Sequence, residues 1–242
     1  VNTISVFFMG SRFGDVKGYN SDASLNQVYS KRMAEIIKAC DKRDMVVLVG
    51  CLYWGNSKGK WEEWTQKEAN MAIENTVKWL SENNFRNVFV DPDNEGMAHR
   101  SKDFNIEEMI AAGKKVDPDI IIGFNDRGIP PSNADLALHF SDKVKGKHYI
   151  ESEGTPPEYW GAYSKEKDLY AYINVGIYTE GKKQKQIKAT DEHLKNGMGY
   201  IFASTWLQNV QPNHNPGGDG TCGDPGIKWW LEHVKENYVN GR

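Results

Sequence analysis

An apolar strand that ends in carboxylates constrains this chain more than any other feature. The strand-forming residues Val88, Phe89 and Val90 run directly into DPDNEG, a cluster of acidic and amide side chains. In an α/β protein, the carboxyl edge of the sheet is where such side chains are presented. A second segment, KHYIESEGTPPEYWG, repeats this order, with two apolar residues followed by two glutamates and a Gly-Pro loop. Two strand ends that each carry a glutamate predict a paired-carboxylate active site.

Length and charge narrow the class of protein further. A chain of 242 residues fits one α/β barrel of about 250 residues, with a substantial core. The net charge of −3 and the lack of a dense Lys/Arg cluster argue against nucleic acid as a partner. No apolar run approaches the roughly 20 residues of a membrane span, so we expect no membrane partner. The chain starts at Val1, so a removed signal peptide and a missing larger piece are both open interpretations.

Hydrophobic periodicity predicts alternating strands and helices. The predicted strands are Asn2–Met9, Met45–Trp54, Asn87–Asp93, Asp119–Asn125, Asp135–Phe140, His148–Glu153 and Tyr200–Trp206. The predicted helices are Ser24–Lys42, Thr65–Asn83, Leu169–Tyr178, Lys185–Lys195 and Ile227–Tyr238, and Thr65 with Glu68 forms a capping box. Such alternation predicts a parallel sheet with crossover helices.

The fold class that follows is a (β/α)8 barrel of the TIM type in a single domain over residues 1–242. Seven strands are predicted where eight are needed, and the first begins at residue 2. The simplest account is that the first β-strand of the barrel is not in this chain. The segments after Asn125 and Phe140 are shorter than the about 10–12 residues of a parallel crossover, so we expect short or absent helices there.

Aromatic side chains gather at or just after the predicted strand ends. They are Tyr53, Trp54, Trp61, Trp64, Tyr159, Trp160, Tyr163 and Trp206. Loop-borne Trp and Tyr offer flat apolar faces with a polar rim, which suits sugar rings. We therefore expect a carbohydrate substrate, with Tyr53, Trp54 and Trp160 among the residues that contact it.

These motifs resemble those of the clan A glycoside hydrolases, the retaining (β/α)8-barrel enzymes that include the family 5 cellulases and mannanases. Asn94-Glu95 resembles the Asn-Glu pair at the end of the fourth strand, which implies that Glu95 is the general acid/base and that Asn94 binds the sugar 2-hydroxyl. Ser152-Glu153-Gly154 resembles the segment of the nucleophile, which implies that role for Glu153. His139 stands where the clan has a histidine near the nucleophile, and Trp206 where it has a tryptophan under the first sugar.

Several assignments stay open. Strand alternation places Glu151 on the same face as Glu153, so Glu151 competes for the role of nucleophile. Family 5 enzymes carry an Arg in their second strand, whereas this chain reads NTIS at residues 2–5, and Arg12 in the following loop is the candidate for that function. Asn125, at the end of the fifth barrel strand, is expected to line the cleft or to form a turn.

Asp91 and Asp93 are expected either to orient Glu95 and arginine side chains or to cap the loop. DPDNEG also resembles the start of a calcium loop, but Lys102 stands at the twelfth position, where a Glu is required, so we expect no metal. We also expect no cofactor.

Three functions are compatible with these residues: a retaining glycosidase with a two-glutamate mechanism, a non-catalytic carbohydrate-binding barrel, and a lyase. Two facing glutamates favour the first, and the missing strand and arginine favour the second. The family resemblance favours an extracellular or periplasmic location.

Overall fold

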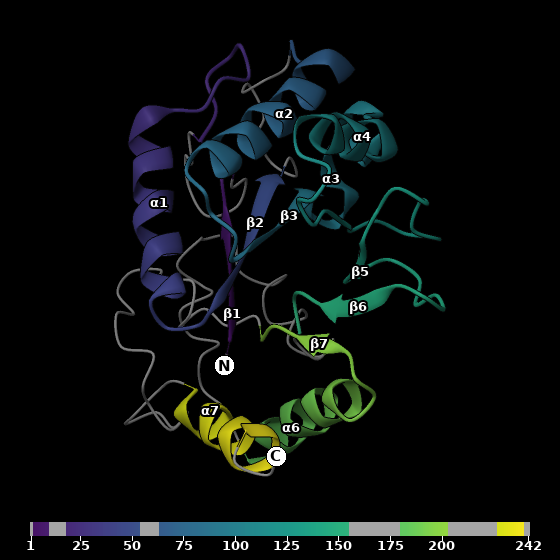
Figure 1. Cartoon of the computed structure of the whole chain (residues 1–242). Coiled ribbons are helices and arrows are strands. Elements are labelled where there is room, and N and C mark those ends of the chain that lie inside the picture. The colour runs from purple at the N-terminus through teal and green to yellow at the C-terminus, as the bar shows by residue number, and fades with distance from the viewer. Residues whose placement is uncertain (1, 10–17, 54–62, 155–179, 203–226, 240–242) are drawn as a thin grey trace, which may run out of the picture. The chain divides into compact units, whose positions relative to one another are not determined.

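The computed structural model describes residues 2–9, 18–53, 63–154, 180–202 and 227–239 (Figure 1). The chain divides into two compact units, residues 2–150 and residues 151–242, and each is described by itself. The prediction of a single domain stays a prediction. No helix among the described residues is both long and apolar enough to cross a membrane.

The first unit begins with parallel strands joined by helices, as predicted. β1 (Thr3–Phe7), β2 (Val46–Leu52) and β3 (Val88–Asp93) pair in that order, with Val47 opposite Val88 and Val49 opposite Val90. The crossovers are α1 (Gln27–Asp41) and α2 (Gln66–Glu82). The buried apolar side chains of both strands and helices form one core.

Local signals define both crossover helices. The Asn26 side chain accepts hydrogen bonds from the first backbone N–H groups of α1. At the start of α2 the predicted capping box is present, because Thr65 and Glu68 bond to each other's backbone N–H groups. The buried residues of α2 recur at steps of three and four along one face, namely Ala69, Ala72, Ile73, Thr76, Val77 and Leu80.

Two helices after β3 were not predicted. They are α3 (Met97–Lys102), which starts directly after the acidic segment, and α4 (Ile106–Val116). The sequence does carry a signal for α4: Asn105 caps its first turn, and the buried residues Ile106, Met109, Ile110 and Gly113 recur at steps of three and four.

The parallel arrangement continues through three shorter strands, β4 (Gly123–Phe124), β5 (Leu136–Leu138) and β6 (His148–Glu151). A parallel bridge between Val90 and Ile122 joins β3 to the β4 segment. All residues from 125 to 147 are described, and they contain no helix, which confirms the expectation for these two connections.

The strand boundaries predicted here were too wide, for two local reasons. Asp119–Asn125 is reduced to Gly123–Phe124 because Asp117 accepts the backbone N–H of Asp119 and closes a turn. Asp135–Phe140 ends at Leu138 because His139 adopts a left-handed backbone with φ 29°.

The second unit contains α6 (Glu180–Leu194), β7 (Gly199–Tyr200), α7 (Lys228–Val234) and a π-helical turn at Lys235–Val239. These agree with the predicted helices Lys185–Lys195 and Ile227–Tyr238, except that α6 starts five residues earlier. Phe202, Ile227, Trp230 and Val234 form a small apolar cluster. The predicted helix Leu169–Tyr178 and most of the predicted strand Tyr200–Trp206 lie outside the described residues.

Candidate active site

The carboxyl end of β3 carries a buried polar segment. All residues from Val88 to Gly96 are buried, so the polar side chains at the strand end are enclosed together with its apolar part. Asn94–Gly96 forms a single 3₁₀ turn that leads into α3. A strand that stops at a tight turn, with its polar groups buried, is a typical way to fix side chains at the edge of a parallel sheet.

Asp91 is fully buried in this segment. Its Oδ2 accepts a hydrogen bond from Asn125 Nδ2 at 2.7 Å. Burial raises the pKa of Asp91 to about 7, although the Asn125 hydrogen bond and the nearby His139 act to lower it; the neighbouring Glu95 acts in the same direction as burial. Among the described residues, no group hydrogen-bonds to Asp91 Oδ1.

Asp93 holds the turn that follows it. Its two carboxylate oxygens accept the backbone N–H groups of Ala98 and His99, each at 2.8 Å. These N–H groups belong to the first turn of α3, so Asp93 performs the loop-capping role that was one of its two predicted roles. Burial raises its pKa to about 8, against the opposing effect of the two N–H donors.

The backbone around Glu95 is left-handed. Glu95 has φ 56° and Gly96 has φ 60°, and the glutamate is only 7% exposed. Arg100 donates a hydrogen bond to the Glu95 carbonyl oxygen, and its Nη1 lies 3.4 Å from Asp126 Oδ1. A Cβ at position 96 would lie 2.1 Å from Asp126 Cγ, so only glycine fits there. Arg100, Asp126 and Gly96 therefore fix the direction in which Glu95 leaves the strand.

His139 lies beside the Glu95 carboxylate, with Nε2 3.9 Å from Oε1. Its left-handed backbone is held by two contacts from β6: Tyr149 donates its hydroxyl to the His139 carbonyl at 2.7 Å, and the His139 N–H donates to Ile150 at 3.0 Å. The ring of the half-exposed Phe140 lies 4.3 Å from the His139 ring. The two predicted residues Glu95 and His139 are thus brought together within the first unit.

Asn94 and Asn125 also meet, with Asn125 Nδ2 3.2 Å from Asn94 Oδ1. Asn125 follows β4 directly and is fully buried. Four residues from three successive strand ends, Asn94, Glu95, Asn125 and His139, therefore converge as the sequence predicts for a site at this edge of the sheet.

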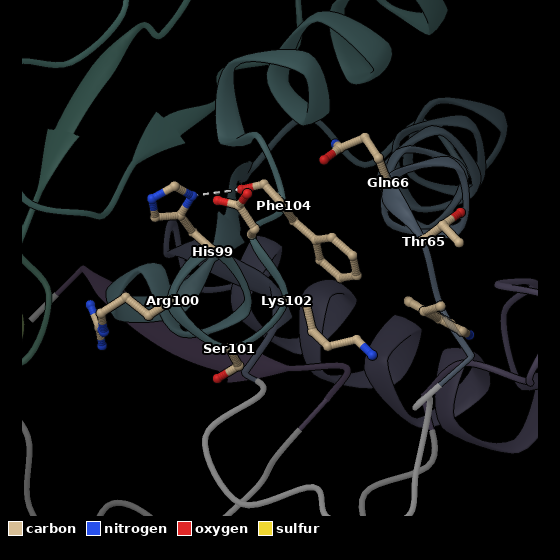
Figure 2. Close-up of a pocket in the computed structure, with 9 residues that line it drawn as sticks. Thr65, Gln66, His99, Arg100, Ser101, Lys102 and Phe104 are labelled. Carbon is tan, nitrogen blue, oxygen red and sulfur yellow. Dashed lines mark hydrogen bonds between the residues drawn. The ribbon is translucent and has the colours of Figure 1, made fainter.

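A pocket of about 820 Å³ lies around α3 and the start of α2, lined by Trp64, Thr65, Gln66, His99, Arg100, Ser101, Lys102, Asp103 and Phe104 (Figure 2). Figure 2 shows the His99 ring turned toward the backbone oxygen of Phe104, to which Nδ1 lies at 2.8 Å. Seven of its nine lining residues have polar or charged side chains, and the pocket adjoins the Glu95 turn through Arg100. It does not include Glu95 or His139.

The other predicted glutamate, Glu153, lies in the second unit, directly after β6. Its backbone N–H donates to Glu151 Oε1 at 3.1 Å, so the Glu151 side chain folds back onto its own loop. Gly154 then passes against the Tyr200 ring, where a Cβ would lie 2.2 Å from Tyr200 Cζ. The Gly154 carbonyl accepts hydrogen bonds from Tyr200 and Gln186. These contacts fix the backbone that carries Glu153.

The remaining predicted contacts fall into two groups. Tyr53 is described, is 6% exposed, and packs its ring 5.5 Å from Phe7. Arg12, Trp54, Trp160 and Trp206 lie outside the described residues. Substrate contact by any of these five residues stays a prediction.

Sequence reasoning did not identify the Arg100–Asp126 pair that holds Glu95. A signal for it exists, since a basic residue one helical turn after the Glu-Gly pair can reach the backbone of that pair, and Asp126 ends the next strand segment. The left-handed backbone of Glu95 carries no such signal, because glutamate is not among the residue types enriched at positive φ, whereas histidine is.

No protein-family model matches the sequence, and no curated protein sequence matches it. Solved structures do match. The match to XacCel5A covers 97% of this chain and 86% of the XacCel5A chain, with a TM-score of 0.59 and 11% sequence identity. The exo-β-1,4-mannosidase Op5Man5 from Opitutaceae bacterium strain TAV5 has a TM-score of 0.57 at 11% identity, over 99% of this chain and 53% of its own. A glycoside hydrolase of family 5 from Bacteroides vulgatus ATCC 8482 has a TM-score of 0.55 at 14% identity, and the match covers 96% of this chain and 57% of that hydrolase.

The chain spans little more than half the length of the last two proteins, and 60% of another solved glycoside hydrolase. These likenesses cover nearly all of the chain, and they support the predicted barrel of the TIM type. Identities of 8–14% show a shared fold alone. The structural neighbours of this chain are family 5 glycoside hydrolases, and it is their fold that the chain shares.

Proposed function

We propose that this protein is a retaining glycoside hydrolase that cleaves O-glycosidic bonds in an oligo- or polysaccharide with two glutamates. One observation carries the proposal: a buried Glu95 leaves the end of β3 on a left-handed turn beside His139, with Asn94 as its neighbour. Burying a carboxyl group and dedicating Arg100, Asp126 and Gly96 to its backbone costs stability, which is typical of a functional site.

In the proposed first step, Glu95 is protonated and gives its proton to the glycosidic oxygen while Glu153 attacks the anomeric carbon. The bond to the leaving group breaks, and a covalent glycosyl ester forms on Glu153. In the second step, Glu95 as a carboxylate takes a proton from water, whose oxygen attacks the same carbon and releases Glu153. Two inversions at one carbon return the original configuration.

Glu153 is preferred to Glu151 as the nucleophile on a contact within the second unit. Glu151 Oε1 accepts the backbone N–H of Glu153 at 3.1 Å, which ties the Glu151 carboxylate to the loop and lowers its nucleophilicity. Glu153 is also the residue next to Gly154, whose backbone is held against Tyr200.

The names of the structural neighbours indicate which sugars to try first. They include an endoglucanase and an exo-β-1,4-mannosidase. We therefore propose a β-linked glucan or mannan, or an oligosaccharide of either, as the first class of substrate. A carbohydrate-binding barrel without turnover is the alternative that the experiment below separates from the enzyme.

The test is an assay of wild type, Glu95→Gln and Glu153→Gln against a panel of aryl glycosides and β-linked oligosaccharides. We expect wild type to cleave at least one substrate with retention, Glu153→Gln to be inactive, and azide to restore turnover to a Glu95→Ala variant. Glu107→Gln, a substitution of an exposed glutamate on α4, is the matched control. If wild type binds an oligosaccharide and cleaves nothing, the protein is a carbohydrate-binding barrel and the proposed glycosidase function is refuted.

A further inference from the structure

Asn125, which donates a hydrogen bond to Asn94, has a role that goes beyond the two glutamates. Asn125 is fully buried, and its single NH₂ group donates to two acceptors, Asp91 Oδ2 at 2.7 Å and Asn94 Oδ1 at 3.2 Å. It therefore links the buried carboxyl group of Asp91 to the asparagine that precedes the proposed acid.

The orientation of the Asn125 amide is set from two sides. Its Oδ1 lies 3.5 Å from the backbone N–H of Phe140, a group that can only donate. Its Nδ2 donates to Asp91 Oδ2 at 2.7 Å. Reversing the amide would place its NH₂ group against the Phe140 N–H, two donors together, so one orientation is favoured.

This orientation is passed on to Asn94. Because Asn125 presents its NH₂ group to Asn94, the atom of Asn94 that faces it has to be the acceptor Oδ1. The Nδ2 of Asn94 then points away from Asn125, within the amide plane. In a buried network of this kind each hydrogen bond counts for more than it would in water, and a reversed amide leaves groups unsatisfied.

We infer that Asn125 is a positioning residue of the proposed glycosidase, which fixes the Asn94 amide so that its Nδ2 is presented as a hydrogen-bond donor to the sugar 2-hydroxyl. The inference rests on the proposed function. The three anchors of Asn125 come from the ends of the two strands on either side of β4, namely Asp91 in β3, Asn94 in the turn after β3, and Phe140 after β5. The donor to the sugar is thus held by the sheet and not by a loop alone.

A positioning role for Asn125 has a consequence that a merely structural role lacks. The contact between Asn94 and the 2-hydroxyl strengthens in the transition state, so misorienting Asn94 slows only substrates that carry this hydroxyl. A 2-deoxy glycoside has no group for Asn94 to bind. Loss of Asn125 should therefore be visible with the 2-hydroxy substrate and nearly silent with its 2-deoxy analogue.

The test measures kcat/KM of wild type, Asn125→Ala and Asn94→Ala with one aryl glycoside and its 2-deoxy analogue. Asn125→Ser is made in parallel, because a serine hydroxyl still offers Asp91 a donor if the alanine variant does not fold. Asn83→Ala, which removes an exposed asparagine at the end of α2, is the control. The double variant Asn94→Ala/Asn125→Ala closes a double-mutant cycle.

We expect Asn125→Ala to lower kcat/KM by about 10- to 100-fold with the 2-hydroxy substrate and by less than about threefold with the 2-deoxy analogue. Asn94→Ala should show the same pattern, and the double variant should be no slower than Asn94→Ala. Equal losses on both substrates, no loss on either, or additive losses in the double variant would overturn the inference. A wild type that cleaves neither glycoside would instead refute the proposed function, and with it this inference.

Discussion

Each unit holds a polar cluster built around aspartate, and the pKa of the aspartate is shifted in opposite directions in the two clusters. At the end of β3, the buried Asp91 and Asp93 have pKa values raised to about 7 and about 8. In the second unit, burial also acts to raise the pKa of Asp191, but hydrogen bonds from Tyr238, His233 and Lys195 outweigh it and lower the pKa to about 2.

The difference lies in the partners. Asp191 is one carboxylate among Tyr238 at 2.6 Å, His233 at 2.8 Å and Lys195 at 3.0 Å, and it joins α6 to the last helical turns. At the β3 end, the described residues offer Asp91 and Asp93 amide and backbone donors only, and further carboxylates lie next to them. A cluster that satisfies its charge holds a fold together, whereas one that crowds like charges in a buried place costs stability and is typical of a site with a function.

The largest expected effect is on the reaction itself. Glu95→Gln keeps the shape of the side chain but removes the proton that the proposed acid gives to the leaving oxygen. We expect kcat/KM toward an unactivated oligosaccharide to fall by about 10²–10⁴-fold. The free energy of unfolding should not fall, which urea titration of the same sample would check. A variant with wild-type activity would remove Glu95 from the mechanism.

The turn after Glu95 should be the most sensitive part of the β3 end to a change of backbone. Gly96→Ala places a Cβ 2.1 Å from Asp126 Cγ at a residue with φ 60°. We expect a loss of about 2–5 kcal/mol, the sum of about 1–2 for the left-handed backbone and about 1–3 for overpacking. Gly128→Ala has a positive φ but no atom within 4 Å of the added Cβ, so chemical denaturation should show only the backbone part there.

The Asp191 cluster should respond with a loss of stability and with no change of chemistry. Asp191→Asn leaves three donors facing a neutral amide, and we expect the free energy of unfolding to fall by about 1.5–3 kcal/mol at pH 7. Folded Asp191 stays ionised down to about pH 2, whereas an unfolded aspartate takes up its proton near 3.9. The stability that it contributes is therefore present above about pH 4 and is lost as the pH falls toward 2, and the variant should lack this loss.

Asp91 should contribute to the free energy of unfolding with the opposite pH dependence. Folded Asp91 keeps its proton up to about pH 7, while the unfolded residue releases it near 3.9, so the folded state binds more protons between these values. Its contribution to stability is present below about pH 4 and is lost as the pH rises to 7, by at most about 1.4 kcal/mol per pH unit. Asp91→Asn should flatten that part of a pH series of unfolding curves. A steeper fall in the variant would contradict this.

The smallest effect is expected where the charge pair is most exposed. Lys195 is one helical turn from Asp191 on α6, and its side chain is 67% exposed. Lys195→Met should change the free energy of unfolding by less than about 0.5 kcal/mol. A loss as large as that of Asp191→Asn would mean that Lys195, and not Tyr238 and His233, satisfies the carboxylate.

The alternation of strands and helices, and the strand end that carries Glu95, were predictable because buried apolar residues follow strict periodicities there. α4 could have been found by the same periodicity. The shortening of two strands could not, because it depends on a turn at Asp117 and on the left-handed backbone of His139, which long-range contacts from Tyr149 impose. The pairing of Asn94 with Asn125 was likewise hidden, since residues 31 apart meet only through the register of the sheet.

The measurement that tests the account most directly is mass analysis of the protein after treatment with an activated 2-deoxy-2-fluoro glycoside of a sugar that wild type cleaves. Such a reagent forms the glycosyl ester with the nucleophile. The ester then reacts only slowly with water, so the intermediate accumulates. The account predicts one sugar attached per chain, on the peptide that contains Glu153, and no attachment in Glu153→Gln. Attachment to Glu151, or turnover of the parent glycoside with no labelled peptide, would contradict it.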